Sequence, residues 1–203
     1  MKIAVVGASG NAGSRIVTEL ASRGHTVTAI ARHPEKIASQ ANVTAKQGDV
    51  HDQAGLAALF AGHDAAISSV HFLDSDPVRL IGAARDSKVG RHLVVGGAGS
   101  LEVAPGVRLV TTPNFPVVYK AEAEKGGAFL DLLGQEKELN WTFLSPSALF
   151  TAGERTGKFR LGTDLLLTGS DGKSWISFED FAVALADEIE RPAHIRSRFT
   201  VGY

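Results

Sequence analysis

A glycine-rich loop between a strand and a helix at the start of the chain is the feature that most constrains its fold. The apolar run KIAVVG (2–7) predicts a buried strand, and NAGSRIVTELASRG (11–24) has the period of an amphipathic helix. Between them lie Gly7, Gly10 and Gly13. Glycines let a backbone approach a pyrophosphate closely, and the free N–H groups of the helix N-terminus stabilise its charge. An ordinary strand–helix turn is the alternative, but this order of elements favours dinucleotide binding.

Apolar runs and helical stretches continue to alternate along the chain. Further strands are predicted at residues 26–32 and 64–70, and strands with the loops that follow them at 43–50, 91–100 and 140–149. Strands that alternate with helices pair in parallel, and both faces of such a sheet must be covered. We therefore expect an α/β fold, a Rossmann-like doubly wound parallel sheet with helices on both faces, over residues 1–145. Residues 146–203 are predicted to form a small C-terminal substrate lobe that shares the core of a single domain.

Composition excludes several kinds of partner and chemistry. The formal net charge is −1 and charges of both signs are mixed, so neither nucleic acid nor an anionic membrane is an expected partner. The chain has no cysteine, which removes disulfides, thiolate nucleophiles and Cys-bound metals. No two of its seven histidines are four residues apart, so no metal site is predicted. The N-terminal apolar stretch is too short for a signal peptide, and a soluble cytoplasmic protein is expected.

The ends of the next three strands bear on which dinucleotide is bound. Arg32 ends the second strand, with no carboxylate before it in that strand. Its planar guanidinium suits a 2′-phosphate, so NADPH is favoured over NADH, although a solvated surface arginine is the alternative. Asp49 and Val50 follow the third strand, where an adenine ring would rest. Ser69 and Val70 end the fourth, beside the nicotinamide half or simply as sheet-edge packing.

Together with motifs further along, these residues resemble a known family. The motifs are KIAVVGASGNAGSRIVTEL, AIARHPEK, HLVVGGAGSLEVAPGVRLV and WTFLSPSALFTAGERTGKFRLGTDLLL, and the resemblance covers nearly the whole chain. The chain is similar to the bacterial NADH-flavin reductase family of the atypical short-chain dehydrogenase/reductase superfamily, which is related to NmrA-like NAD(P)-binding proteins and biliverdin reductase B. The resemblance implies a Rossmann domain that binds NAD(P)H beside a shallow cleft for a flat aromatic acceptor.

The resemblance also implies roles for individual residues. The phosphates would be bound by Gly7, Ser9, Gly10, Asn11 and Ala12, and a 2′-phosphate by Arg32. Asp49 and Val50 would contact the adenine. The nicotinamide would be flanked by Ser69, Val70, Gly96, Gly97, Pro146 and Ser147. The family name specifies NADH, whereas Arg32 favours NADPH, so NADP(H) is the predicted cofactor and NAD the second possibility.

The stretch VVYKAEAEK contains the candidate catalytic residues. Dehydrogenases of this superfamily use a tyrosine with a lysine four residues on, one helical turn away, as an acid/base pair. Four residues after Tyr119 stands Ala123, while Lys120 lies about 100° round the helix and Lys125 largely on the opposite side. A conventional dehydrogenase or epimerase is therefore disfavoured. Tyr119 and Lys120 remain candidates for the border of an acceptor site, with a solvated helix start as the alternative.

Direct hydride transfer to a flavin or quinone needs no dedicated acid, and FMN would then be a substrate rather than a bound cofactor. His71, directly after the fourth strand, is a candidate donor in the cleft or an ordinary loop residue. Phe72, Phe115 and Phe150 could floor an acceptor site or pack the core. The leading prediction is an NADPH-preferring reductase. The alternative is a non-catalytic NADP(H)-sensing protein, and either is expected as a monomer or weak homodimer.

Overall fold

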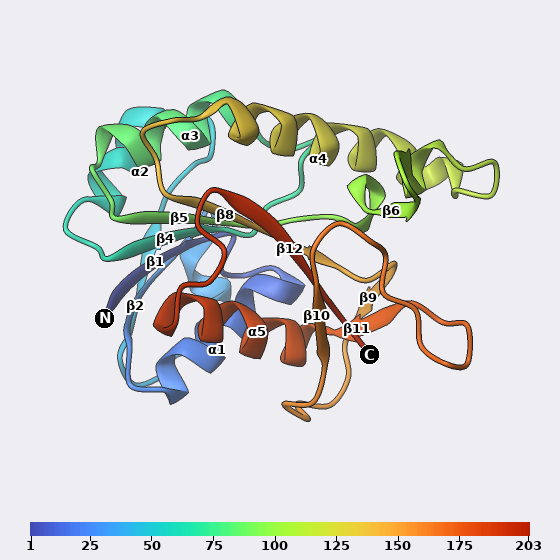
Figure 1. Ribbon diagram of the computed structural model, residues 1–203. Helices are drawn as coiled ribbons and strands as arrows, with labels where there is room; N and C mark the ends of the chain where they lie inside the picture. Colours follow the sequence, from blue (N-terminus) through green and yellow to red (C-terminus); the bar gives the residue numbers. More distant parts are fainter.

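A central sheet of eight strands separates two layers of helices in the computed structural model, which describes residues 1–203 (Figure 1). The strand order is β3-β2-β1-β4-β5-β8-β12-β10, parallel throughout except for β10 at one edge. The sheet strands are β1 (Lys2–Val6), β2 (Thr26–Ala31), β3 (Val43–Gln47), β4 (Ala65–Ser68), β5 (Arg91–Val95), β8 (Trp141–Pro146), β10 (Arg160–Gly162) and β12 (Ser197–Gly202). This confirms the predicted Rossmann-like fold class. The order reverses between β1 and β4, where such sheets open a crevice at their carboxyl edge.

Five α-helices cover the two faces of the sheet. They are α1 (Asn11–Ser22), α2 (Gln53–Phe60), α3 (Pro77–Asp86), α4 (Val117–Gln135) and α5 (Phe178–Glu190). Figure 1 shows α2, α3 and α4 on one side of the sheet and α1 with α5 on the other. Each central strand is buried on both faces, which explains the nearly continuous apolar runs in the sequence.

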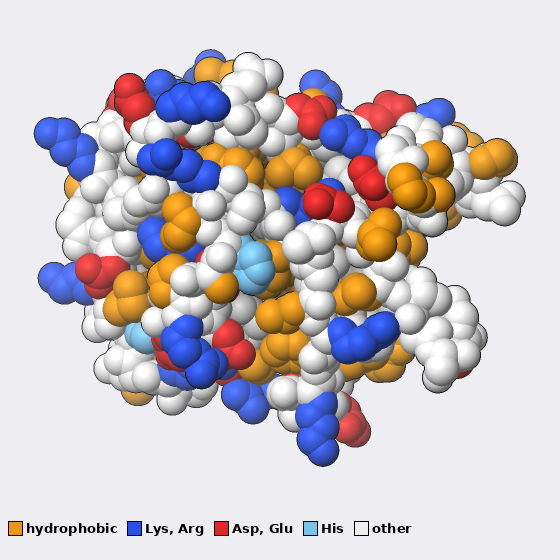
Figure 2. Space-filling view, viewed as in Figure 1, with side chains coloured by type: hydrophobic (Ala, Val, Ile, Leu, Met, Phe, Trp, Pro, Cys, Tyr) orange, Lys and Arg blue, Asp and Glu red, His pale blue; other side chains and the backbone are white.

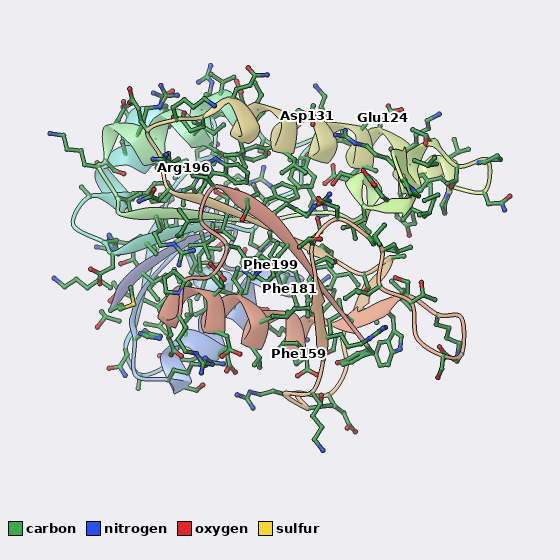
Figure 3. The ribbon with its side chains drawn as sticks, viewed as in Figure 1. Glu124, Asp131, Phe159, Phe181, Arg196 and Phe199 are labelled. Atoms are coloured by element: carbon green, nitrogen blue, oxygen red, sulfur yellow. The ribbon has the colours of Figure 1, made fainter.

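Two hydrophobic clusters hold the three layers together. One lies between the sheet and the α1–α5 layer, and Figure 3 shows its Phe181 and Phe199 between α5 and the strands. The other lies under α2, α3 and α4 and includes Phe129 and Phe143, whose ring centroids are 6.5 Å apart. Each cluster contains residues from distant parts of the chain, and the two clusters lie on opposite faces of the same sheet. No helix is both long and apolar enough to cross a lipid bilayer.

The C-terminal segment divides differently from the expected lobe of residues 146–203. Helix α5 packs beside α1, and β12 lies between β8 and β10 in the main sheet, so both complete the main body. The excursion between β8 and α5 adds β10 to the edge of the main sheet, and only its β9 (Leu149–Thr151) and β11 (Trp175–Ser177) stand apart, paired with each other in parallel. The buried Asp180 accepts hydrogen bonds from the Thr156 and Gly157 N–H groups, both at 2.8 Å, which ties the excursion to α5.

A small hairpin follows β5. Strands β6 (Glu102–Ala104) and β7 (Val107–Arg108) pair in antiparallel fashion after β5, in the stretch that leads to α4. Three short 3₁₀ turns connect other elements, at Pro34–Lys36, Ala98–Ser100 and Leu109–Thr111. Figure 1 shows the start of α4 with this hairpin on one side of the carboxyl edge of the sheet and β9 with β11 on the other.

Candidate functional site

A cleft of about 440 Å³ opens at the carboxyl edge of the sheet, where the strand order reverses. The loops after β1, β2, β3, β4 and β5 form most of its wall, and α4, α5 and β9 add one or more residues each. Of the residues predicted from sequence, the cleft is lined by Gly7, Ser9, Gly10, Asn11, Ala12, Arg32, Val50, Ser69, Val70, His71 and Gly96. The structure thus brings together residues spread over nearly ninety positions of sequence in one concave surface.

The glycine loop approaches β4 so closely that a side chain at its first glycine has no room. Gly7 has a φ of +82°, and a Cβ there would lie 1.9 Å from the backbone oxygen of Ser69. A Cβ on Gly13 would lie 2.1 Å from the oxygen of Gly7, so the third glycine lets α1 pack against its own loop. These contacts explain why the loop requires glycine at both positions.

The N-terminus of α1 presents free N–H groups to the cleft. Gly10 is the N-cap and no side chain caps the helix, while the first N–H bonded back to it is that of Ser14, at 2.9 Å. The N–H groups of Asn11, Ala12 and Gly13 therefore have no partner within the chain. No acidic residue lies in the first turn. Unpaired N–H groups and the helix dipole together make this end suitable for a phosphate.

Arg32 lies beside this anion-binding end, and its guanidinium is not engaged by any carboxylate. It is exposed, lines the cleft and forms no ion pair, whereas the nearby Glu35 is within 3.2 Å of His33. Asp49, the acidic residue that follows β3, does not line the cleft. Its carboxylate instead accepts the His51 N–H at 2.9 Å. The charge available to a bound anion here is thus positive.

Part of the cleft wall is apolar and aromatic, and its side chains are called the aromatic end. Phe150 and Phe178 line it with ring centroids 4.6 Å apart, and Phe150 also contacts the buried Phe181 at 4.7 Å. Phe72 lines the cleft from the loop after β4. Phe115 does not line it. Phe72 and Phe150 thus line the cleft and also pack against the core, and Phe178 is an aromatic lining residue that the sequence did not reveal.

Beneath the cleft, His92 of β5 is fully buried, and its Nε2 lies 2.9 Å from the hydroxyl of Ser68 on β4. Burial lowers the pKa of the His92 imidazole to about 4, because the charged form would be removed from water. His92 is therefore neutral at physiological pH. It belongs to the sheet that supports the cleft and does not line the cleft itself.

Glu122 of α4 also lines the cleft, although sequence reasoning did not single it out. Its carboxylate accepts the N–H groups of Phe72 and Leu73 at 2.7 and 2.8 Å, and lies 3.4 Å from Nδ1 of His71. The signal available in the sequence was helical spacing, because Glu122, Gly126 and Phe129 share the inward face of α4. Asp74 is a further lining residue that was not predicted.

The two α4 residues proposed for catalysis do not line this cleft. Tyr119 is 63% exposed in the first turn of α4 and its hydroxyl has no hydrogen bond within the chain. Lys120 lines a separate polar hollow with Arg108 and Asp131. The reason is the position of the helix: its first turn extends outward beside the β6–β7 hairpin, where Figure 2 shows exposed hydrophobic side chains at the right.

Three other predicted residues lie outside the cleft wall. Pro146 and Ser147 are buried, and the Ser147 hydroxyl donates to the oxygen of Val201 at 3.1 Å, so it faces β12. Gly97 does not line the cleft, and a Cβ there would lie 3.6 Å from the ring of Phe72. The pairing of β8 with β12 accounts for the first two, since it turns the end of β8 toward the C-terminal strand.

Fold and cleft together define an NAD(P)-binding protein of the Rossmann class. Residues 7–192 match the NAD(P)H-binding family, and the chain belongs to that family. It is 42% identical to the Bacillus subtilis protein YwnB, over 99% of this chain and 98% of YwnB. These findings place the chain in an oxidoreductase-type family.

Two solved structures extend the comparison. An epimerase candidate from Bacteroides thetaiotaomicron is 40% identical, with a TM-score of 0.95 over 100% of this chain and 96% of that one. A Streptococcus pneumoniae protein, named provisionally as an NADH-flavin reductase, is 37% identical with a TM-score of 0.81 over 100% and 99%. The resemblance to the atypical short-chain dehydrogenase/reductase group is thus confirmed.

Proposed function

We propose that this chain is an NADPH-preferring reductase that passes hydride directly to a flat aromatic acceptor, a flavin or a quinone. The observation that carries the proposal is one cleft whose wall combines the free N–H groups of α1 and Arg32 with aromatic side chains, with no tyrosine–lysine pair facing it. The name of the Streptococcus pneumoniae relative supports a flavin as acceptor. FMN would then be a substrate, and the protein would act as a monomer or weak homodimer.

The residues of the anion-binding end fit a phosphorylated dinucleotide. The free N–H groups at the start of α1 would hold the pyrophosphate, and Arg32 would pair with a 2′-phosphate. The close contact between Gly7 and Ser69 brings backbone rather than side chains to this end of the cleft, which leaves space for an extended ligand. Bound NADPH supplies a hydride, the equivalent of two electrons and a proton.

At the aromatic end, the chain would act chiefly by orientation. Phe72, Phe150 and Phe178 would hold a flat ring and exclude water from one side of it. His71 is 82% exposed and lines the same cleft, so it or water can deliver the proton that completes reduction. A conventional dehydrogenase or epimerase would instead need an acid/base group aimed into the cleft, and Tyr119 is not placed there.

The same geometry also suits a protein that only senses NADP(H), since a binding cleft without a dedicated acid needs no chemistry. Turnover separates the two functions. Purified protein is mixed with NADPH and FMN, riboflavin or a simple quinone, and the absorbance of the reduced nicotinamide is followed. Acceptor-dependent oxidation is expected. Tight NADPH binding with no oxidation by any of these acceptors would favour the sensor and exclude the reductase.

A further inference from the structure

The loop between β4 and α3, residues 71–75, forms one wall of the cleft. It contributes His71, Phe72 and Asp74 to the lining. Inside the loop, the Asp74 N–H and the Ser75 hydroxyl both donate to the oxygen of His71, at 3.2 and 2.9 Å. All hydrogen bonds from the loop to another part of the chain go to one side chain, Glu122 of α4. The hydrogen bonds that hold this wall in place are thus those from the loop to Glu122.

Glu122 holds the loop with both oxygens of its carboxylate. Oε1 accepts the Phe72 N–H at 2.7 Å, and Oε2 accepts the Leu73 N–H at 2.8 Å. Hydrogen bonds to an ionised acceptor are about twice as strong as neutral ones. Oε1 also lies 3.4 Å from Nδ1 of His71. The Glu122 side chain is 27% exposed, so its charge is only partly screened by water.

Packing of the Phe72 ring fixes the same loop from below. One turn beyond Glu122, Gly126 faces this ring, and a Cβ there would come within 2.7 Å of it. The ring is stacked on Phe143 at 6.3 Å and meets Phe129 edge-on at 6.1 Å. A Cβ on Gly96, which lines the cleft, would lie 2.3 Å from the Phe143 ring. Helix α4, the loop and the end of β5 therefore form one continuous contact.

We propose that Glu122 is a positioning residue for the acceptor: it clasps residues 71–75 and so fixes His71 and Phe72 at the aromatic end of the cleft. This inference rests on the proposed function. The helix that would carry a tyrosine–lysine pair in related dehydrogenases thus serves the cleft through a carboxylate. The anion-binding end does not depend on this clasp, because backbone contacts between the β1 loop and β4 form it.

Amide hydrogen exchange of the ligand-free protein tests the clasp without any reaction. Glu122→Ala removes both acceptors, Glu122→Gln leaves one oxygen able to accept, and Glu124→Ala on the same helix is the control, because Glu124 is exposed and holds no hydrogen bond. Exchange at Phe72 and Leu73 should quicken by about tenfold or more in Glu122→Ala, the effect of losing a hydrogen bond to a charged group. Glu122→Gln should be intermediate and Glu124→Ala unchanged.

Kinetics then test the role in positioning. In Glu122→Ala the KM for FMN should rise by about tenfold, while the Kd for NADPH stays within about twofold, and Glu122→Gln should recover part of the loss. Unchanged exchange at Phe72 and Leu73, or an NADPH Kd that rises as much as the FMN KM, would overturn the proposal. A wild-type protein that reduces no acceptor overturns the reductase function and the acceptor role together, whereas intact FMN reduction with unchanged exchange overturns the role of Glu122 alone.

Discussion

The two ends of the cleft are built in different ways. At the anion-binding end the wall is mostly backbone: the glycine loop lies against Ser69, and the first turn of α1 supplies N–H groups. At the aromatic end the wall is made of side chains from distant elements, with Phe72 from the β4–α3 loop and Phe178 from α5. A backbone site depends on local chain order, whereas a side-chain site depends on how separate elements pack. The first end can therefore be inferred from a short motif and the second cannot.

Gly7→Ala tests the backbone end and should have the largest effect. The new Cβ would meet the Ser69 oxygen and would sit on a residue with positive φ, so we expect a loss of about 3 kcal/mol in unfolding free energy and of NADPH binding. Gly24→Ala is the matched control, because Gly24 has a φ of +81° but no atom within 4 Å of a new Cβ. That variant should lose only about 1 kcal/mol. Equal losses in urea unfolding would show that the close contact has no special importance.

Arg32→Glu tests the charge beside the same end. Removal of the guanidinium and addition of a negative charge should raise the Kd for NADPH by about a hundredfold, with the Kd for NADH within about threefold. Lys46→Glu makes the same change of charge on exposed β3, outside the cleft, and should leave both constants nearly unchanged. Titration by nicotinamide fluorescence measures the Kd of each variant for NADPH and for NADH. A similar weakening of NADPH and NADH would contradict a phosphate contact.

His92→Gln tests whether the buried histidine in the sheet beneath the cleft makes the unfolding free energy depend on pH. Its pKa is about 4 in the folded chain against 6.5 ordinarily, so the unfolded chain binds the extra proton as the pH falls below 6.5. Its stabilising contribution is complete above that pH and is lost progressively toward pH 4. Between pH 7 and 5.5 the wild type should lose about 1 kcal/mol more than His92→Gln. Parallel stability curves for the two proteins in urea would rule out this titration.

Tyr119→Phe should have the smallest effect, because its hydroxyl is exposed and lies outside the cleft. We expect kcat with NADPH and FMN within about twofold of the wild type. Loss of a general acid lowers rates by about 10²- to 10⁴-fold, so a drop of that size would return Tyr119 to the reaction. Such a result would also show that the start of α4 moves over the aromatic end during turnover.

The success of the sequence predictions follows this division. Strand alternation and the glycine motif correctly predicted the parallel sheet and the loop between its first strand and first helix, because each follows from consecutive residues. Arg32 follows β2 directly and lines the cleft, and its role toward a 2′-phosphate stays a prediction. Counting helical turns from Tyr119 is also enough to exclude the lysine pair, since i to i+4 spacing is a local property of the helix.

The aromatic end required the tertiary structure. Glu122 was identifiable only as an inward-facing helical position, and the sequence gives no sign that its carboxylate meets Phe72 and Leu73 some fifty residues earlier. Phe178 lies near the cleft because α5 packs beside α1, and Ser147 turns away because β12 pairs with β8.

What the sequence determined by itself is therefore the fold class and the glycine loop that leads into α1, because short-range backbone geometry suffices for both. Only the tertiary structure decided which side chains form the aromatic end. It also decided which residue of α4 faces the cleft: the first turn of the helix lies beyond the cleft, so that Glu122 faces it and Tyr119 does not. The position of the helix is set by packing between elements, through contacts such as Gly126 on Phe72, and not by the order of residues within α4.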